Sequence, residues 1–168
     1  MSGYGTGTSP SQVAAAIETA SVVLPGEFTV DTLPPPALNL DRYARVTDLF
    51  GVKRDLVLAS MAGPMAFWQP VRPVFSTSQA VAASMTLTPL KSPSVLHLTG
   101  NLPGNTNITL SQSLAYPGAS FEIAFDGSLG LFSLNLIGLN GGGLLSLLAG
   151  GRRRVFWDLA TASWKQFS

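Results

Sequence analysis

The chain has 168 residues, of which 46% are hydrophobic and only 11% are charged, and ten Lys and Arg residues against nine Asp and Glu residues give a net charge of +1. This balance excludes a nucleic-acid binder with a strongly basic field, and the ample apolar content excludes a disordered chain. An average globular protein carries about 25% charged residues, so we expect partners to cover part of this charge-poor surface. The length fits one domain of ordinary size or two small ones.

Cysteine and histidine, on which many catalytic and metal sites depend, are absent or scarce. The chain has no cysteine, which excludes disulfides, thiolate metal sites and cysteine nucleophiles. Its one histidine is His97, so a zinc site or a catalytic triad would have to be built around that residue. Residues 1–5 have neither the basic nor the apolar segment of a secretory signal, and we expect no such signal here.

Residues 1–37 have the composition of an attachment arm. Ser9-Pro10-Ser11-Gln12 is a capping sequence, and the helical spacing of the apolar residues that follow it predicts a short amphipathic helix over 9–22. A helix this short is marginal alone, and the stiff spacer Pro34-Pro35-Pro36 follows it. We therefore expect residues 1–30 to dock on a partner.

The rest of the chain has the pattern of short strands separated by Gly and Pro turns. Their spacing near ten residues predicts a mainly β fold, an antiparallel β-sandwich or barrel-like domain, preceded by the short helix and extended arm. We expect a strand-rich proximal region over 38–90 and a C-terminal β-sandwich module over 91–168, with a hairpin turn at Asp126-Gly127. The predicted strands are 27–32, 43–47, 55–60, a piece that opens with Phe67 and Trp68, 84–88, 95–98, 108–110, 121–125, 132–136, 144–148, 153–158 and 164–167.

One uncharged stretch, from Gly127 to Gly151, has the length of a membrane-spanning helix. Its glycine triplet at 141–143 disfavours a helix by about 1 kcal/mol per residue. Phe132 and Leu134 also alternate with polar neighbours at the strand period. We therefore predict buried strands joined by a glycine turn, with no membrane insertion.

No residue cluster has a spacing that is typical of a catalytic centre. His97 alternates with Leu96 and Leu98, which indicates a solvated or hydrogen-bonded strand residue, and no acidic residue lies between Asp55 and Glu122. Glycoside hydrolysis needs two facing acids, but no carboxylate here has a distinctive local context. The nine are Glu18, Glu27, Asp31, Asp41, Asp48, Asp55, Glu122, Asp126 and Asp158.

One set of basic residues and one set of tryptophans each allow two interpretations. Arg152-Arg153-Arg154 with Lys165 could bind an acidic partner or an anionic glycan, but we favour a charged strand end that prevents edge-to-edge pairing. Trp68, Trp157 and Trp164 could form a sugar-stacking platform, but we favour packing anchors.

Two short patterns carry less weight. Asn107-Ile108-Thr109 matches a glycosylation acceptor, which matters only in a secretory compartment. The glycine run at 138–143 has no following lysine and no strand–loop–helix setting, so it is not a phosphate-binding loop.

The C-terminal half contains several motifs in a characteristic order. Asn107-Ile-Thr-Leu110 is followed by Pro117-Gly118-Ala-Ser-Phe121-Glu-Ile123, by Asp126-Gly127-Ser128-Leu-Gly130 and, near the end, by Trp164-Lys165. In this order they resemble the β-structured distal modules of bacteriophage tail fibres, head fibres and spikes.

A second segment, Ala44 to Gly51 and on through Phe67-Trp68-Gln69-Pro70, is also similar to phage structural proteins. One departure is the final turn, Leu159-Ala-Thr-Ala162, where the family usually has an Asp-Gly type turn. The resemblance implies a virion component that is not an enzyme, usually a homotrimer, with an N-terminal segment that docks on the particle and a distal β domain that faces outward.

These observations predict a trimeric fibre or spike protein, located in the virion, that contacts other virion proteins (capsid, portal or adaptor, or tail) through residues 1–30 and that could touch a host-surface receptor. Two alternatives stay open: a capsid cement or decoration protein, and a small carbohydrate-binding β module. We expect no catalytic, cofactor-binding or metal-binding residues and no nucleic-acid partner.

Overall fold

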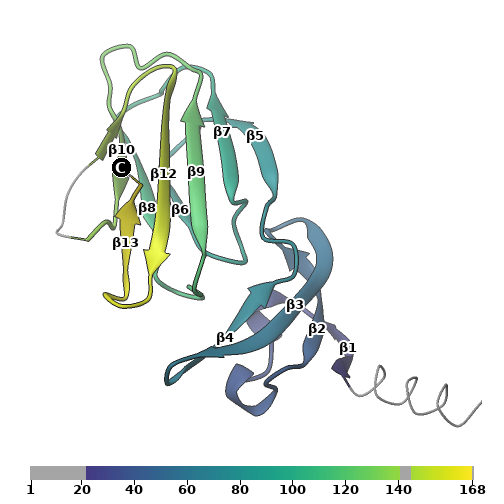
Figure 1. Cartoon of the computed structure of the whole chain (residues 1–168). Coiled ribbons are helices and arrows are strands. Elements are labelled where there is room, and N and C mark those ends of the chain that lie inside the picture. Colours follow the sequence, from purple (N-terminus) through teal and green to yellow (C-terminus); the bar gives the residue numbers. More distant parts are fainter. Residues whose placement is uncertain (1–21, 141–144, 168) are drawn as a thin grey trace, which may run out of the picture.

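The computed structural model describes residues 22–140 and 145–167, and β-strands dominate this part of the chain (Figure 1). Two short 3-10 turns, η1 (Val30–Thr32) and η2 (Pro36–Leu38), accompany the strands. The mainly β prediction is confirmed. The strands are β1 (Val23–Phe28), β2 (Tyr43–Leu49), β3 (Lys53–Ala62), β4 (Met65–Pro70), β5 (Ser76–Ala80), β6 (Met85–Leu87), β7 (Val95–Thr99), β8 (Thr106–Leu110), β9 (Ser120–Phe125), β10 (Leu134–Ile137), β11 (Leu145–Leu147), β12 (Gly151–Asp158) and β13 (Ser163–Gln166).

The first four strands form one sheet in the order β1-β2-β3-β4, which we call the N-terminal sheet. β2, β3 and β4 are antiparallel neighbours, and β1 runs parallel to β2. The turn between β2 and β3 needs left-handed backbone at two successive residues, Phe50 (φ 57°) and Gly51 (φ 83°). Gly51 suits this turn because it has no Cβ to oppose a positive φ.

The remaining strands form two sheets, β13-β12-β9-β7-β5 and β11-β10-β8-β6, which we call together the C-terminal β unit. From β5 to β10 the chain alternates between these sheets, and within each sheet the neighbours pair in parallel. β11, β12 and β13 then add antiparallel partners. The pairing therefore differs from the antiparallel arrangement that the sequence predicted.

The prediction of a hairpin turn at Asp126-Gly127 is wrong, because the chain alternates between the two sheets here. After β9 the chain crosses to the other sheet, where β10 pairs in parallel with β8. The antiparallel neighbour of β9 is β12, which begins at Gly151. A parallel pair requires a long crossover connection rather than a tight turn.

The N-terminal region also differs from its prediction. β1 includes residues of the expected arm and pairs with β2, so the expected boundary at residue 37 falls within one sheet. The predicted spacer packs on this sheet, since the Trp68 indole N–H donates to the Pro34 carbonyl at 2.8 Å. The expected boundary at residue 90 lies between β6 and β7, both in the C-terminal β unit. The predicted helix over 9–22 lies outside the described residues, apart from its last one.

The uncharged stretch forms strands where strands were expected. β10 and β11 pair in antiparallel register, with Leu134 opposite Leu147. The glycine triplet at 141–143 lies outside the described residues. Within 22–140 and 145–167, no helix is long and apolar enough to span a membrane.

Candidate functional site

Folding places a carboxylate beside the one histidine. His97 on β7 lies opposite Ala124 on β9, and its Nδ1 is 3.8 Å from Oδ2 of Asp126 just after that strand. His97 is half-buried on the face opposite the buried Leu96 and Leu98, as the alternation predicted. The two groups form an ion pair when the imidazole is protonated. Only the parallel register of β7 and β9 brings Asp126 here, and the sequence carried no signal of that register.

Most of the other carboxylates have partners that explain their positions. Glu27 pairs with Arg54, Asp31 with Lys91, Asp55 with Lys53, and Asp158 with Lys165. Within the described residues there is no group of three or more His, Asp or Glu side chains that could hold a metal ion.

The pKa of Asp158 shows what such pairing does. The Lys165 ammonium, the Thr161 hydroxyl and the backbone N–H of Ala160 hold the pKa of this carboxyl below its usual value. Asp158 and Lys165 therefore both carry charge at neutral pH, and their pairing links the ends of β12 and β13, which is a structural role.

The three successive arginines of β12 point alternately to the two faces of their sheet. Arg152 and Arg154 are exposed, and Arg154 lies over the Phe167 ring at 4.7 Å from its centre. Arg153 points the other way and is half-buried. β12 lies between β9 and β13, but β13 pairs only with residues 155–158, so Arg152 and Arg153 lie beyond the end of β13. Their interpretation as a charged strand end that prevents edge-to-edge pairing stays a prediction.

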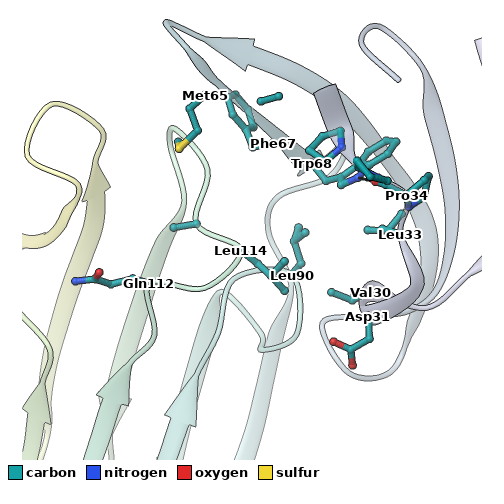
Figure 2. A pocket seen from close by; sticks show the side chains of 14 residues that line it. Val30, Asp31, Leu33, Pro34, Met65, Phe67, Trp68, Leu90, Gln112 and Leu114 are labelled. Carbon is teal, nitrogen blue, oxygen red and sulfur yellow. Dashed lines mark hydrogen bonds between the residues drawn. The ribbon is translucent and has the colours of Figure 1, made fainter. Parts of the chain in front are cut away.

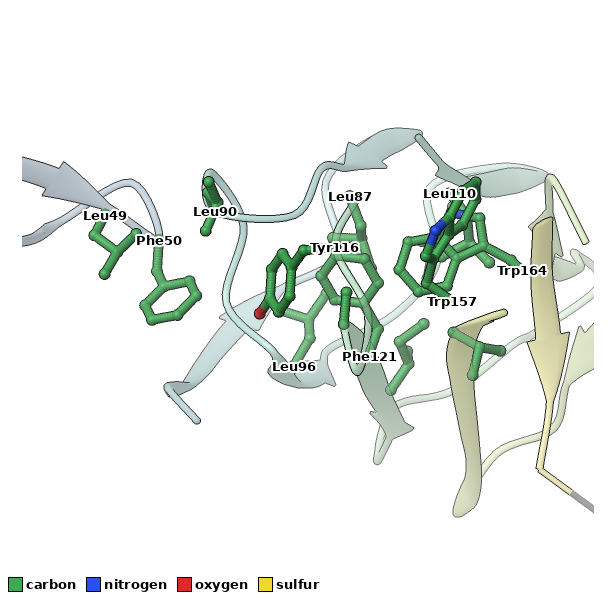
Figure 3. Close-up of a cluster of buried hydrophobic side chains, with 14 of the residues drawn as sticks. Leu49, Phe50, Leu87, Leu90, Leu96, Leu110, Tyr116, Phe121, Trp157 and Trp164 are labelled. Atoms are coloured by element: carbon green, nitrogen blue, oxygen red, sulfur yellow. The ribbon is translucent and has the colours of Figure 1, made fainter. Parts of the chain in front are cut away.

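The three tryptophans are buried, which confirms the prediction that they are packing anchors. Trp164 is 0% exposed, its ring centre lies 5.6 Å from that of Trp157, and its indole N–H donates to the Ser111 carbonyl at 2.9 Å (Figure 3). Trp157 and Trp164 lie in the core and offer no open face on which a sugar could stack, and Trp68, which lines the cavity described below, is 6% exposed.

A groove of about 350 Å³ lies on the outer face of the five-stranded sheet. Its lining includes Glu122, which lies between its strand partners Val95 and Arg154. Val74 and Tyr116 also line the groove. Burial raises the pKa of Tyr116 to about 12, so its phenol stays neutral at physiological pH. The groove offers one carboxylate and one guanidinium on adjacent strands, without a nucleophile activated by a base.

A cavity of about 510 Å³ lies between the N-terminal sheet and the C-terminal β unit (Figure 2). Phe67, Trp68 and Leu33 line one side, and Leu90 and Leu114 line the other. Its ionisable group is the Asp31 carboxylate, which already pairs with Lys91. An apolar cavity without a reactive pair suits an apolar side chain of a partner better than a reaction.

The glycosylation pattern lies on a strand. Asn107 is on β8 and is half-buried, and its side-chain oxygen accepts a hydrogen bond from the Asn135 amide at 3.3 Å. The side chain is therefore already engaged on the sheet surface.

No known protein family and no curated protein matches the chain. Among solved structures, the chain is similar to a protein in a "Structure of a chaperone-substrate complex", with 15% sequence identity and a TM-score of 0.39. The match covers 75% of this chain and 25% of that chain.

Proposed function

We propose that the protein is a structural component of a bacteriophage particle, a homotrimeric fibre or spike protein that docks through its N-terminal region. On this proposal its work is to assemble with copies of itself and with other virion proteins, and its outer part is free to touch a host-surface receptor. It performs no chemistry.

The observation that carries the proposal is the composition of the described surface. Large apolar side chains are exposed on both β regions, including Leu38, Val52, Val74, Leu131 and Leu148. Together with 11% charged residues, this is the surface of a protein whose partners cover it, since exposed apolar patches mark interaction sites. Among the described residues, the candidate chemical groups are paired or buried in ways that explain them structurally.

The alternative of a carbohydrate-binding module loses its main support because the three tryptophans are buried. A capsid cement or decoration protein keeps the same support as a fibre, because it also works by covering apolar surface between neighbours. The two differ in where the protein lies on the particle.

The test is to purify particles of the virus that encodes the chain and to count its copies by quantitative mass spectrometry. We expect a fixed number per particle that is a multiple of three. Electron microscopy with a labelled chain separates a fibre or spike from a layer on the capsid. Absence of the chain from purified particles would overturn the proposal.

A further inference from the structure

The two outer faces of the C-terminal β unit differ in charge. The outer face of the five-stranded sheet carries His97 and Glu122, and also Arg152, Arg154 and Lys165. The four strands of the other sheet, β6, β8, β10 and β11, contain no Asp, Glu, Lys, Arg or His within their described residues. One face is therefore built for water, and the other lacks the charges that keep a surface soluble.

The alternation along these four strands identifies the residues of the uncharged outer face. Buried leucines and Ile108 point inward, so the residues between them point outward. The outward residues are Thr86, Asn107, Thr109, Asn135, Ile137 and Ser146. We call this set the uncharged face.

Three of the five polar side chains of the uncharged face, those of Asn107, Asn135 and Ser146, are hydrogen-bonded to one another. The Asn135 amide donates to Asn107 at 3.3 Å and to Ser133 at 3.1 Å, and its oxygen accepts from the Ser146 hydroxyl at 3.1 Å. The backbone N–H of Asn107 donates to the Ser84 hydroxyl at 2.9 Å. A row of paired amides and hydroxyls thus crosses β8, β10 and β11.

This pairing decides which kind of partner the face suits. A glycan is recognised through free donors and acceptors, but here Asn135 is only 8% exposed and its oxygen and nitrogen are engaged. Polar groups that are satisfied within one surface can be covered by another without leaving unpaired groups, which would otherwise cost stability. The cores of protein–protein interfaces are likewise depleted in charge. The face therefore suits a protein surface of the same uncharged kind.

Exposed apolar side chains extend this surface at one end of the sheet. Leu134 pairs with Leu147, so residues just before β10 and just after β11 lie at the same end. Leu131 is 99% exposed, Phe132 43% and Leu148 65%. The four strands alone present roughly 300 Å², from their usual spacing and rise, whereas a stable interface buries about 800 Å² per partner. The three apolar residues add contact area at this end of the sheet.

We propose that a second copy of this chain covers the uncharged face together with Leu131, Phe132 and Leu148, and that this is the main contact between copies in the oligomer. This inference rests on the proposed function and identifies the surface through which its copies assemble. Because the face carries no charge, copies can bring it against one another around the three-fold axis of the proposed trimer without placing like charges together.

The experiment places a lysine on each outer face of the full chain. Thr109→Lys puts the charge at the centre of the uncharged face, and Ser76→Lys puts it on exposed β5 of the other sheet as the matched control. Thr86→Lys, on the exposed outer side of β6, is a second test variant in case Thr109→Lys does not fold. Circular dichroism verifies folding, and sedimentation velocity over a concentration series gives the association constant.

We expect the wild type and Ser76→Lys to form the same oligomer, and Thr109→Lys and Thr86→Lys to associate at least about 100-fold more weakly, because a buried unpaired charge is strongly unfavourable. If folded Thr109→Lys and Thr86→Lys both associate as the wild type does, the inference is overturned and the proposed function stands. If Ser76→Lys dissociates equally, the contact is not specific to the uncharged face and the inference is also overturned. A monomeric wild type overturns it together with the homotrimer, whereas presence in the particle is decided separately by the particle count.

Discussion

Trp164 connects both sheets of the C-terminal β unit through one side chain. It pairs with Trp157 across β12 and β13, and its indole N–H reaches the Ser111 carbonyl just after β8 of the other sheet. Its ring also packs on Phe121 of β9, with ring centres 5.2 Å apart. Removing this ring would therefore leave a cavity at a point where three strands and a loop meet.

We expect Trp164→Ala to lower the free energy of unfolding by about 3–5 kcal/mol. Chemical denaturation at one fixed protein concentration measures the change, because association with other copies also contributes to stability. Leu38→Ala, at an exposed position in η2, is the control and should change stability by less than about 0.5 kcal/mol. Equal stability of Trp164→Ala and the wild type would contradict the assignment of Trp164 as an anchor.

Tyr116 gives the protein a dependence on alkaline pH. Burial raises the pKa of its phenol from 10 to about 12, so the folded state holds the proton more tightly than the unfolded state does. The neutral phenol therefore makes its full contribution to the free energy of unfolding below pH 10, and this contribution is lost as the pH rises through 12.

The difference corresponds to about 3 kcal/mol. We predict that the wild type loses about 2 kcal/mol more stability than Tyr116→Phe when urea denaturation is compared at pH 9 and at about pH 12, where the folded-state phenol is half ionised. Because both proteins share every other titrating group, parallel losses in the two proteins would show that Tyr116 is not responsible.

At the scale of elements, alternation predicted the strands well and their partners poorly. Val95 to Leu98 and Phe121 to Phe125 alternate, and both form strands with the predicted residues buried. Alternation specifies which side chains point inward, but it carries no information about which strand lies alongside. The parallel neighbours β7 and β9 are separated by a whole strand in the other sheet, which a local pattern cannot indicate.

Among the strands of residues 22–140 and 145–167, the one that sequence reasoning missed entirely is β5, with the sequence Ser-Thr-Ser-Gln-Ala. It has no large apolar residue because it is the edge of its sheet and is mostly exposed. The candidate sites were predicted only in part for the same reason, because a local pattern carries no information about strand order. The burial of the tryptophans was predicted, whereas the meeting of His97 with Asp126 and the interior position of β12 both depend on strand order.

The two β regions are held together at a small set of contacts. Phe50 of the N-terminal sheet stacks on Phe75, with ring centres 5.8 Å apart and planes within 3°. The Phe50 N–H donates to the Leu90 carbonyl at 2.6 Å, and Asp31 pairs with Lys91. Residues 71–74 connect the two regions and are exposed.

Phe75→Ala removes the stack and should weaken the packing between the two β regions by about 2–3 kcal/mol of free energy. We expect proteinase K to cleave the connection at 71–74 about tenfold faster or more than in the wild type, since cleavage follows the population of the open form. Phe167→Ala, which removes an exposed aromatic just after β13, is the control. Unchanged cleavage in Phe75→Ala would mean that the remaining contacts suffice to hold the two regions together.

At the scale of the whole molecule, charge is distributed by region. The N-terminal sheet carries ion pairs on its surface, among them Arg54 with Glu27 and Lys53 with Asp55. The C-terminal β unit concentrates its charge on one sheet and leaves the other uncharged. The C-terminal β unit of a chain with only 11% charged residues thus has one charged side and one uncharged side, and on the inference above a second copy covers the uncharged side.

Two truncations separate attachment from folding. β1 is part of the N-terminal sheet: Leu24 is buried, and the Phe28 carbonyl accepts a hydrogen bond from Thr47. Removing residues 1–28 therefore exposes the edge of β2 and should lower the free energy of unfolding by several kcal/mol, from the lost burial and backbone pairing. Removing residues 1–21 leaves every strand of that sheet in place, so we expect its unfolding transition to match that of the wild type.

The 1–21 deletion tests the proposed attachment role without removing any described strand. We expect the 1–21 deletion to form the same oligomer as the full chain in sedimentation but to be missing from particles assembled in a host that lacks the wild-type protein. Loss from the particle without loss of stability is the result that a purely structural segment cannot produce. If this deletion joined particles at normal copy number, attachment would lie elsewhere, and the apolar cavity beside Trp68 and Leu114 would be the next surface to test by substitution.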